Sequence, residues 1–99
     1  MAKYFLTNKA VDDLGEIWDY TYGTWSEKQA DAYYGLLINA CQAIAENPDI
    51  GRKYEEIGLG IKGFRVSKHI LFYHIANKDR IEIIRVLHEQ MDLKSRMGE

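Results

Sequence analysis

The spacing of the apolar residues changes once along this chain of 99 residues, and that change limits the folds available to it. Up to Pro48 the apolar residues recur at intervals of three and four, which is the period of an amphipathic α-helix. After Gly63 they fall into short runs of the kind that form β-strands. Helices followed by strands predict the α+β class, in which the helices cover one face of a sheet.

Two helices are expected in the first half of the chain. The first should begin near Asn8, and its apolar face contains Val11, Leu14, Ile17, Trp18 and Tyr22. Ser26 with Gln29 three residues later has the pattern of a capping box, which begins the second helix. That helix has a clean apolar face formed by Ala30, Tyr33, Tyr34, Leu37, Ala40, Cys41 and Ile44. Asn47-Pro48 ends it, and the short connection between the two helices predicts an antiparallel hairpin.

Strands are expected on both sides of this hairpin. A short one precedes it at Lys3–Thr7. Three runs follow a glycine-rich loop: one that opens with Phe64 and Val66, then His69–Ala76, then Arg80–His88. Short polar turns between them predict an antiparallel meander of three strands. The whole chain, residues 1–99, is therefore expected to form one domain in which residues 89–99 are a C-terminal tail.

Composition narrows the class of protein further. Cys41 is the only cysteine, so no disulfide can form within the chain, which suits a reducing compartment. The N-terminal segment lacks the apolar core of a signal peptide, and no apolar run approaches the length that crosses a membrane. We therefore expect a cytoplasmic protein.

Charge is distributed unevenly between the two halves. Residues 1–50 contain 3 Lys and Arg against 8 Asp and Glu, whereas residues 51–99 contain 10 against 7. The halves thus carry net charges of −5 and +3, which agree with −2 for the chain. One acidic and one basic surface would follow, unless these charges merely cover solvated faces.

The histidines offer little metal chemistry. His69 and His74 are separated by an odd number of residues, so within one strand they should point to opposite faces. Neither the histidine spacing nor the single cysteine fits a metal site, and no phosphate-binding loop or nucleophile elbow is present. His88, which follows Arg85 near the end of the last strand, could act as a general acid or base, or could be an ordinary surface imidazole.

Arg85 is the residue whose charge fits least well with its place in the predicted strand. Strand alternation places it with Ile81, Ile83 and Leu87 on a mostly apolar face, where a guanidinium needs a partner or water. Either it pairs with an acidic residue such as Glu55 or Glu56, or it lines a binding groove. Among the aromatic residues, Trp25 could lie exposed at the hairpin tip. Four tyrosines are expected in the core or between the helices: Tyr20, Tyr22, Tyr33 and Tyr34.

The segment "GFRVSKHILFYHIANKDRIEIIRVLHEQMD", after a strand and a helical hairpin, resembles the ParE branch of the RelE/ParE toxin superfamily. The resemblance covers nearly the whole chain and is most specific in "HILFY" with the preceding Arg65, and in "IRVLHEQMD". RelE-like members are ribosome-dependent messenger RNA endonucleases, whose reaction needs a base, an acid and cations around the phosphate. Ile70 stands where related nucleases tend to have arginine, and this departure favours the ParE activity.

The ParE resemblance implies a toxin that binds and poisons DNA gyrase, with no catalytic residues, no cofactor and no metal. It also implies a ParD-like antitoxin, whose disordered segment folds on the helical hairpin and the sheet groove. No direct sequence-specific binding to nucleic acid and no membrane partner are expected. Candidate residues for the gyrase contact are Arg65, Arg85, His88, Lys94 and Arg96. Candidates for the antitoxin contact are Trp18, Trp25, Tyr33 and Phe72.

Two other functions remain open at this level. One is a ribosome-dependent endonuclease of the RelE type that uses His88 and Arg85. The other is a degenerate toxin that only binds its antitoxin.

Overall fold

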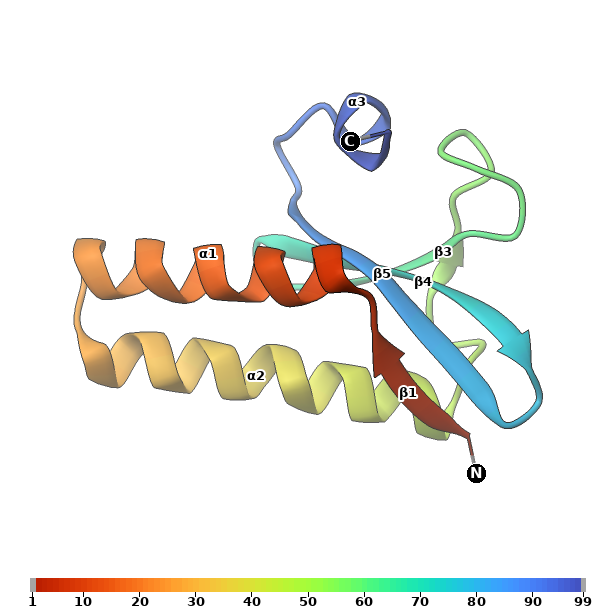
Figure 1. Cartoon of the computed structure of the whole chain (residues 1–99), viewed down its shortest axis with the longest axis horizontal. Helices are drawn as coiled ribbons and strands as arrows, with labels where there is room; N and C mark the ends of the chain where they lie inside the picture. Colours follow the sequence, from red (N-terminus) through yellow and green to blue (C-terminus); the bar gives the residue numbers. More distant parts are fainter. Residues whose placement is uncertain (1, 99) are drawn as a thin grey trace.

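A computed structural model describes residues 2–98 and has the predicted α+β architecture (Figure 1). A helical hairpin covers one face of a five-stranded sheet, whose strand order is β1-β5-β4-β3-β2. The elements are β1 (Lys3–Leu6), α1 (Asn8–Thr24), α2 (Glu27–Glu46), β2 (Arg52–Lys53), β3 (Lys62–Val66), β4 (His69–Asn77), β5 (Arg80–His88) and α3 (Leu93–Met97). No helix within these residues is long and apolar enough to cross a membrane.

The sheet combines the predicted meander with two additions. β3, β4 and β5 pair antiparallel in chain order, as expected. β1 lies parallel to β5, with Lys3 opposite Arg80 and Leu6 opposite Ile83, so the first and last strands of the chain are neighbours. The two-residue strand β2 pairs with β3 and was not predicted. The sheet is therefore mixed.

Both helices of the hairpin begin with a hydroxyl cap. The Oγ1 atom of Thr7 accepts a hydrogen bond from the amide of Ala10 at 3.1 Å. The Oγ atom of Ser26 accepts one from the amide of Gln29 at the same distance, which confirms the predicted cap. α2 ends at Glu46, one residue before the Asn47-Pro48 pair.

The main core lies between the hairpin and the sheet. Its fully buried side chains come from both helices and from the two central strands, and include Leu14, Leu37, Ile44, Leu71, Tyr73, Ile81 and Ile83. Cys41 belongs to this core, and burial raises the pKa of its thiol to about 11. The thiol therefore stays protonated and behaves as a small apolar group.

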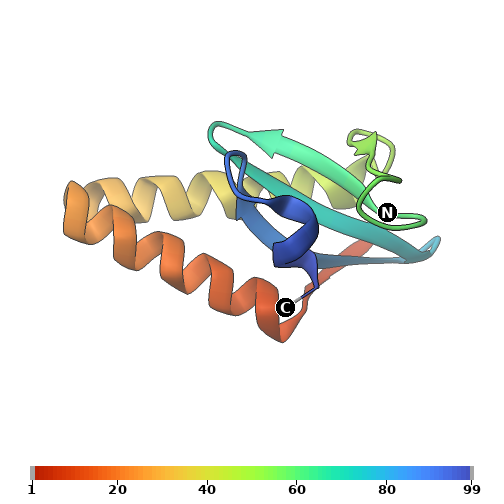
Figure 2. The ribbon, with the colours of Figure 1, turned by 90° about the horizontal axis from the view of Figure 1, so that it is seen from above.

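A second group of buried residues, the outer cluster, lies on the opposite face of the sheet. It consists of Tyr54, Ile70, Phe72 and Leu87. Leu93 and Met97 of α3 pack against it, together with Ile57 and Ile61 of the loop after β2. Figure 2 shows α3 and this loop lying over the sheet. Part of the expected tail, residues 89–99, is thus a short helix docked on the outer cluster.

A β-bulge in β5 changes which face its residues occupy. Phe72 pairs with Arg85 but the next residue of β4, Tyr73, pairs with Ile83, so Ile84 is the extra residue. Ile81 and Ile83 pack in the main core, whereas Leu87 belongs to the outer cluster. The prediction that placed Leu87 on the same face as Ile81 and Ile83 is wrong, because the extra residue reverses the alternation.

Three of the four tyrosines expected inside are exposed. Tyr20 is 70% exposed, Tyr22 is 54% exposed and Tyr34 is 39% exposed. Only Tyr33 is half-buried as predicted. Each helix touches the sheet and its neighbour with only part of its circumference, so an apolar face wider than this contact extends into solvent. Trp25 is 71% exposed next to the hairpin tip, as the sequence suggested.

Candidate functional site

A groove of about 970 Å³ lies between α1 and the chain that leaves the end of β5. The α1 wall and the hairpin tip contribute charged and aromatic side chains, among them Asp12, Glu16, Tyr20 and Trp25. α2 contributes Gln29 and Tyr33. The opposite wall is formed by the β3–β4 turn, the paired ends of β4 and β5, and the tail, and includes Lys68, His69, His88, Met91 and Arg96.

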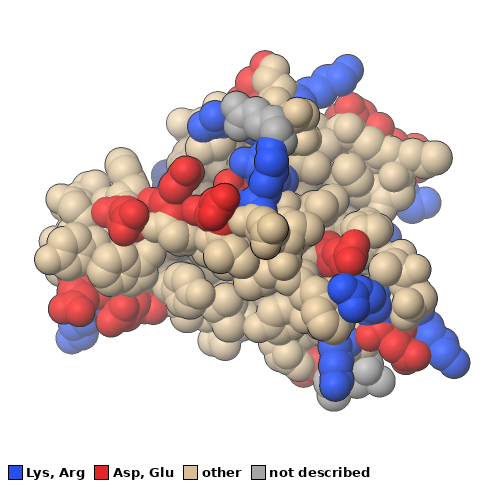
Figure 3. Space-filling model, viewed as in Figure 1, with Lys and Arg blue, Asp and Glu red and all other residues tan. Residues whose placement is uncertain are grey.

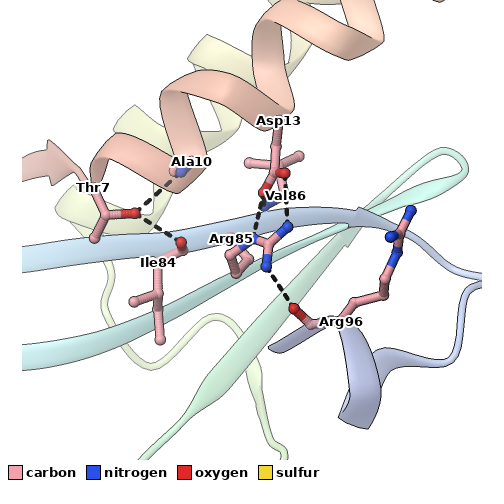
Figure 4. A network of polar contacts seen from close by, with 7 residues as sticks. All are labelled: Thr7, Ala10, Asp13, Ile84, Arg85, Val86 and Arg96. Carbon is pink, nitrogen blue, oxygen red and sulfur yellow. Dashed lines mark hydrogen bonds and ion pairs between the residues drawn. The ribbon is translucent and has the colours of Figure 1, made fainter. Parts of the chain in front are cut away.

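Asp13 and Arg85, which belong to the lining of this groove, form a buried ion pair (Figure 4). Arg85 donates from Nε to Oδ2 of Asp13 at 2.8 Å and from Nη2 to Oδ1 at 2.9 Å. Both residues are buried, Asp13 with 7% and Arg85 with 8% of its surface exposed. The third nitrogen, Nη1, donates to the backbone oxygen of Arg96 at 2.5 Å. Arg85 thus joins α1, β5 and the C-terminal helix.

These contacts correct two expectations for Arg85. Its partner is Asp13 rather than Glu55 or Glu56. The bulge places Arg85 opposite Phe72 of the outer cluster, so it does not share the face of Ile81 and Ile83 as the alternation predicted. Arg85 also lines the groove, which was the other expectation for it, and its role as a gyrase contact stays a prediction. In the free toxin its guanidinium holds α1 and the C-terminal helix to β5.

The edge of β5 beyond β1 is completed by α1 and its cap (Figure 4). β1 ends at Leu6, and the amide of Thr7 donates to the oxygen of Ile83 at 3.1 Å. The hydroxyl of Thr7 donates to the oxygen of Ile84 at 2.8 Å, and the amide of Val86 donates to Oδ2 of Asp13 at 2.9 Å. Along this part of β5, side chains of Thr7 and Asp13 therefore bond the backbone groups that a neighbouring strand would otherwise bond. Left without partners, these buried groups would destabilise the fold.

Two histidines meet in the groove at the paired ends of β4 and β5. The rings of His69 and His88 are 5.2 Å apart and nearly perpendicular. Nδ1 of His69 lies 2.6 Å from the hydroxyl of Tyr33, and Nδ1 of His88 accepts a hydrogen bond from the amide of Gln90. Burial, with His88 as a second cause, lowers the pKa of His69 to about 4. His69 is consequently uncharged at neutral pH.

His74 points away from this pair, as the sequence predicted. Its Nε2 atom lies 2.7 Å from Oε1 of Glu82 on the adjacent strand. The hydrogen bond from His74, followed by that from Arg80, holds the pKa of Glu82 below its usual range. Within residues 2–98, no group of three or more His, Cys, Asp and Glu side chains is arranged to hold a metal ion.

The other expected gyrase residues are divided between the groove and its surroundings. His88 and Arg96 line the groove. Arg65 is 65% exposed and forms an ion pair with Glu89 at 2.8 Å. Lys94 lies exposed on α3. The structure thus brings His88 and Arg96 together and places Arg65 and Lys94 outside the lining.

The expected antitoxin residues lie in different parts of the molecule. Trp25 and Tyr33 line the groove. Trp18 stacks on Tyr22 and donates from Nε1 to Asp31 at 3.0 Å, across the two helices. Phe72 is fully buried in the outer cluster of the free toxin, and its contact with the antitoxin stays a prediction. The α3 helix and the loop after β2 pack against this cluster.

Asp13 is the important residue that sequence reasoning missed. It lies three residues after Ala10 and four before Ile17. That spacing puts its carboxylate on the buried face of the helix. An acidic residue in an apolar helical register is a signal for a buried ion pair, and Arg85 was the unexplained cation available for it.

Comparisons with known proteins decide the family. A family model described as "ParE toxin of type II toxin-antitoxin system, parDE" matches residues 4–93. The chain belongs to the ParE toxin family. Toxin ParE1 of Mycobacterium tuberculosis (strain ATCC 25618 / H37Rv) is 39% identical over 92 residues, which are 93% of this chain and 94% of the relative. Toxin ParE1 of Caulobacter vibrioides is 35% identical over 98 residues, which are 99% of this chain and 100% of the relative.

The fold of this ParE toxin also matches a solved structure. A chain of the chromosomal ParDE toxin–antitoxin system from P. aeruginosa superposes with a TM-score of 0.78, at 17% sequence identity. The match covers 89% of this chain and 96% of that one. The protein is therefore a ParE-type toxin of a type II toxin–antitoxin system, and such a toxin has an antitoxin as its partner.

Proposed function

We propose that this ParE toxin acts by binding DNA gyrase, without catalysing a reaction, and that a ParD-like antitoxin neutralises it. One observation carries the first half of the proposal: the arginines that a phosphate-cleaving site would use are bound to carboxylates. Arg85 is held by Asp13 in a bidentate pair, and Arg65 is paired with Glu89. Ile70, where related nucleases tend to have arginine, is buried in the outer cluster.

The exposed cations of the C-terminal helix are the proposed gyrase contact. Lys94 and Arg96 project from α3, which Asp92 caps through the amide of Ser95. Arg85 fixes the position of this helix through the backbone oxygen of Arg96. Cations on an anchored element suit the recognition of a large partner, because less conformational freedom is lost on binding.

The groove is the proposed antitoxin site. It is lined by Trp25 and Tyr33, and aromatic side chains are the usual anchors of protein interfaces. A disordered segment that folds as it binds would cover this surface and the adjoining hairpin. Because Arg96 lies both on α3 and in the groove lining, an antitoxin bound there would also obstruct the proposed gyrase contact.

Plasmid supercoiling by purified gyrase tests the proposal. The toxin should inhibit supercoiling and cause cleaved DNA to accumulate, and the protein encoded beside the toxin gene should restore supercoiling. The double variant Lys94→Glu/Arg96→Glu should lose most of the inhibition. Its matched control is Lys53→Glu/Lys78→Glu, which makes the same charge change elsewhere on the surface and should inhibit normally. Undiminished supercoiling at saturating toxin would remove the proposal.

A second candidate function is a ribosome-dependent endonuclease. The pair of His69 and His88, beside Lys68 and Arg96 in one groove, is the observation that favours it. If the toxin cleaves messenger RNA on translating ribosomes and His88→Ala abolishes the cleavage, this function is favoured over gyrase inhibition. If the chain neither inhibits gyrase nor cleaves messages but still binds its antitoxin, it is a degenerate toxin.

A further inference from the structure

The loop between β2 and β3 carries the most exposed large apolar side chain within residues 2–98. Leu59 is 94% exposed, whereas the next one, Trp25, is 71% exposed. Ile57 and Ile61, which lie two residues before and after Leu59, pack against the outer cluster. The loop therefore turns two of its branched apolar side chains toward the sheet and holds the third in water.

The backbone of this loop is fixed by its own hydrogen bonds. The amide of Tyr54 donates to the oxygen of Ile61 at 2.9 Å, and the oxygen of Tyr54 accepts from the amides of Ile57 and Gly58. The amide of Ile61 donates to the oxygen of Gly58 at 3.2 Å. These bonds close the loop at its base and leave Leu59 at its tip.

The two glycines that flank Leu59 suit this shape. A Cβ atom on Gly58 would lie 2.7 Å from Cδ1 of Ile61, so Ile61 would have to shift. Gly60 has a φ of 77°, which lies in the left-handed region that favours glycine. The local sequence therefore supports the conformation that exposes the leucine.

Tyr54 fastens the loop to the sheet. Its ring takes the space of a side chain at Gly63, where a Cβ atom would lie 2.5 Å from Cε2 of the ring. The ring meets that of Phe72 edge to face, with the centroids 5.1 Å apart, and the guanidinium of Arg52 lies 3.7 Å from its centroid. These contacts hold the loop in one position on the sheet.

The loop and the C-terminal helix share one support. Ile57 and Ile61 of the loop, and Leu93 and Met97 of α3, pack against the same outer cluster. Both elements lie on the same side of the sheet (Figure 1 and Figure 2). Figure 3 shows basic side chains next to the C-terminal helix. One partner surface can therefore meet the cations of α3 and the tip of the loop together.

We propose that Leu59 is an apolar anchor of the target contact: it enters an apolar pocket of the target protein, while Lys94 and Arg96 meet carboxylates beside that pocket. This inference rests on the proposed function. It adds the loop after β2 to the contact and states the chemistry of the site that the target presents.

The physical basis is the order of the loop in the free toxin. A leucine on a fixed backbone loses little conformational freedom when a partner covers it. Its burial removes apolar surface from water, which favours association. An apolar centre with charged groups around it is also the usual arrangement of a protein interface. Because Leu59 is 94% exposed, removing it should change the stability of the fold very little.

Growth arrest and inhibition of supercoiling, both with the full-length toxin, test the anchor. Leu59→Ala should raise the concentration needed to inhibit gyrase about ten- to thirtyfold and relieve growth arrest, with an unchanged melting temperature. Leu59→Met keeps an apolar side chain of similar size and should inhibit normally. The matched control is Leu36→Ala, which removes the same atoms from a leucine of α2 that is 45% exposed and should also inhibit normally.

Salt separates the anchor from the cations. Added salt screens charges and leaves the burial of a leucine in place. Affinity for immobilised gyrase should therefore fall with salt equally steeply in Leu59→Ala and in the wild type. The double variant Lys94→Glu/Arg96→Glu should lose much of this salt dependence.

Full potency of Leu59→Ala in both assays would overturn the inference, and so would an equal loss in Leu36→Ala. A wild type that arrests growth but leaves supercoiling intact would reject gyrase as the target. In that case, relief of growth arrest by Leu59→Ala would support the anchor toward another protein, and full arrest would overturn it. A wild type that is inert in both assays would overturn both proposals.

Discussion

The two faces of the sheet are covered very differently. On one face, α1 and α2 contribute 17 and 20 residues, and their side chains that face the sheet include Leu14, Leu37 and Ile44, which are almost completely buried. On the other face, the cover is a loop and the five-residue helix α3, whose contacts Leu93 and Met97 are only half-buried. This difference in cover indicates that the two faces have different roles. The hairpin face stabilises the fold, and the thinly covered face carries the exposed cations of the tail.

Arg85 is the residue that connects the two faces, and its loss should have the largest effect. Arg85→Ala should lower the free energy of unfolding by about 3–5 kcal/mol, because Asp13 would remain buried without its counter-charge. Urea denaturation measures this change. The double variant Asp13→Ala/Arg85→Ala removes the unpaired charge and should lose less stability than the sum of the single variants. Additive losses would mean that the two side chains do not interact in solution.

A single type of substitution compares the faces directly. Leu37→Ala removes a fully buried side chain from the main core and should cost about 2–5 kcal/mol. Leu93→Ala removes the same atoms from a half-buried position over the outer cluster and should cost about 1 kcal/mol. Equal losses in thermal or urea unfolding would contradict the division between a stabilising face and a thinly covered one.

The pH dependence of stability should come in part from the hairpin face. Since the folded state holds the pKa of His69 near 4, against 6.5 for an unperturbed histidine, the unfolded chain binds the extra proton between these values. Stability should therefore fall as the pH drops from 6.5 toward 4, by at most about 1.4 kcal/mol per pH unit. Urea unfolding of the wild type and of His69→Gln measures it. An identical slope in both proteins would assign the loss to other groups.

The smallest expected effect concerns the turn at the edge of the groove. Ser67 adopts a positive φ of 56°, which is costly for a residue with a Cβ atom. Ser67→Gly should stabilise the protein by about 0.5 kcal/mol, after the greater freedom of glycine in the unfolded chain is taken into account. The control is Ser67→Ala, which keeps the Cβ atom and should bring no gain. A lower melting temperature for the glycine variant would contradict this reading of the turn.

Most of the fold on the hairpin face could be predicted from the sequence. Apolar periodicity located α1 and α2, Ser26 marked the start of α2, and the Asn47-Pro48 pair marked its end within a residue. Short polar turns predicted the meander of β3, β4 and β5. These features are local, so each can be recognised from neighbouring residues.

The features that shape the groove are not local. The bulge at Ile84 depends on how β5 registers against β4, and it reverses the alternation predicted for Arg85 and Leu87. The parallel pairing of β1 with β5 joins residues almost eighty positions apart. The α3 helix is too short for a periodic signal and is held by packing and by Arg85. Such features follow from tertiary contacts, which a residue pattern does not contain.

The anchor of the C-terminal helix has an evolutionary consequence. Arg85 donates a hydrogen bond to the backbone oxygen of residue 96, a group that every amino acid possesses. Substitutions on α3 can therefore alter what the toxin recognises while the hold on the segment persists. Duplicated copies of such a gene could therefore acquire different target proteins while the C-terminal helix stays attached in the same way.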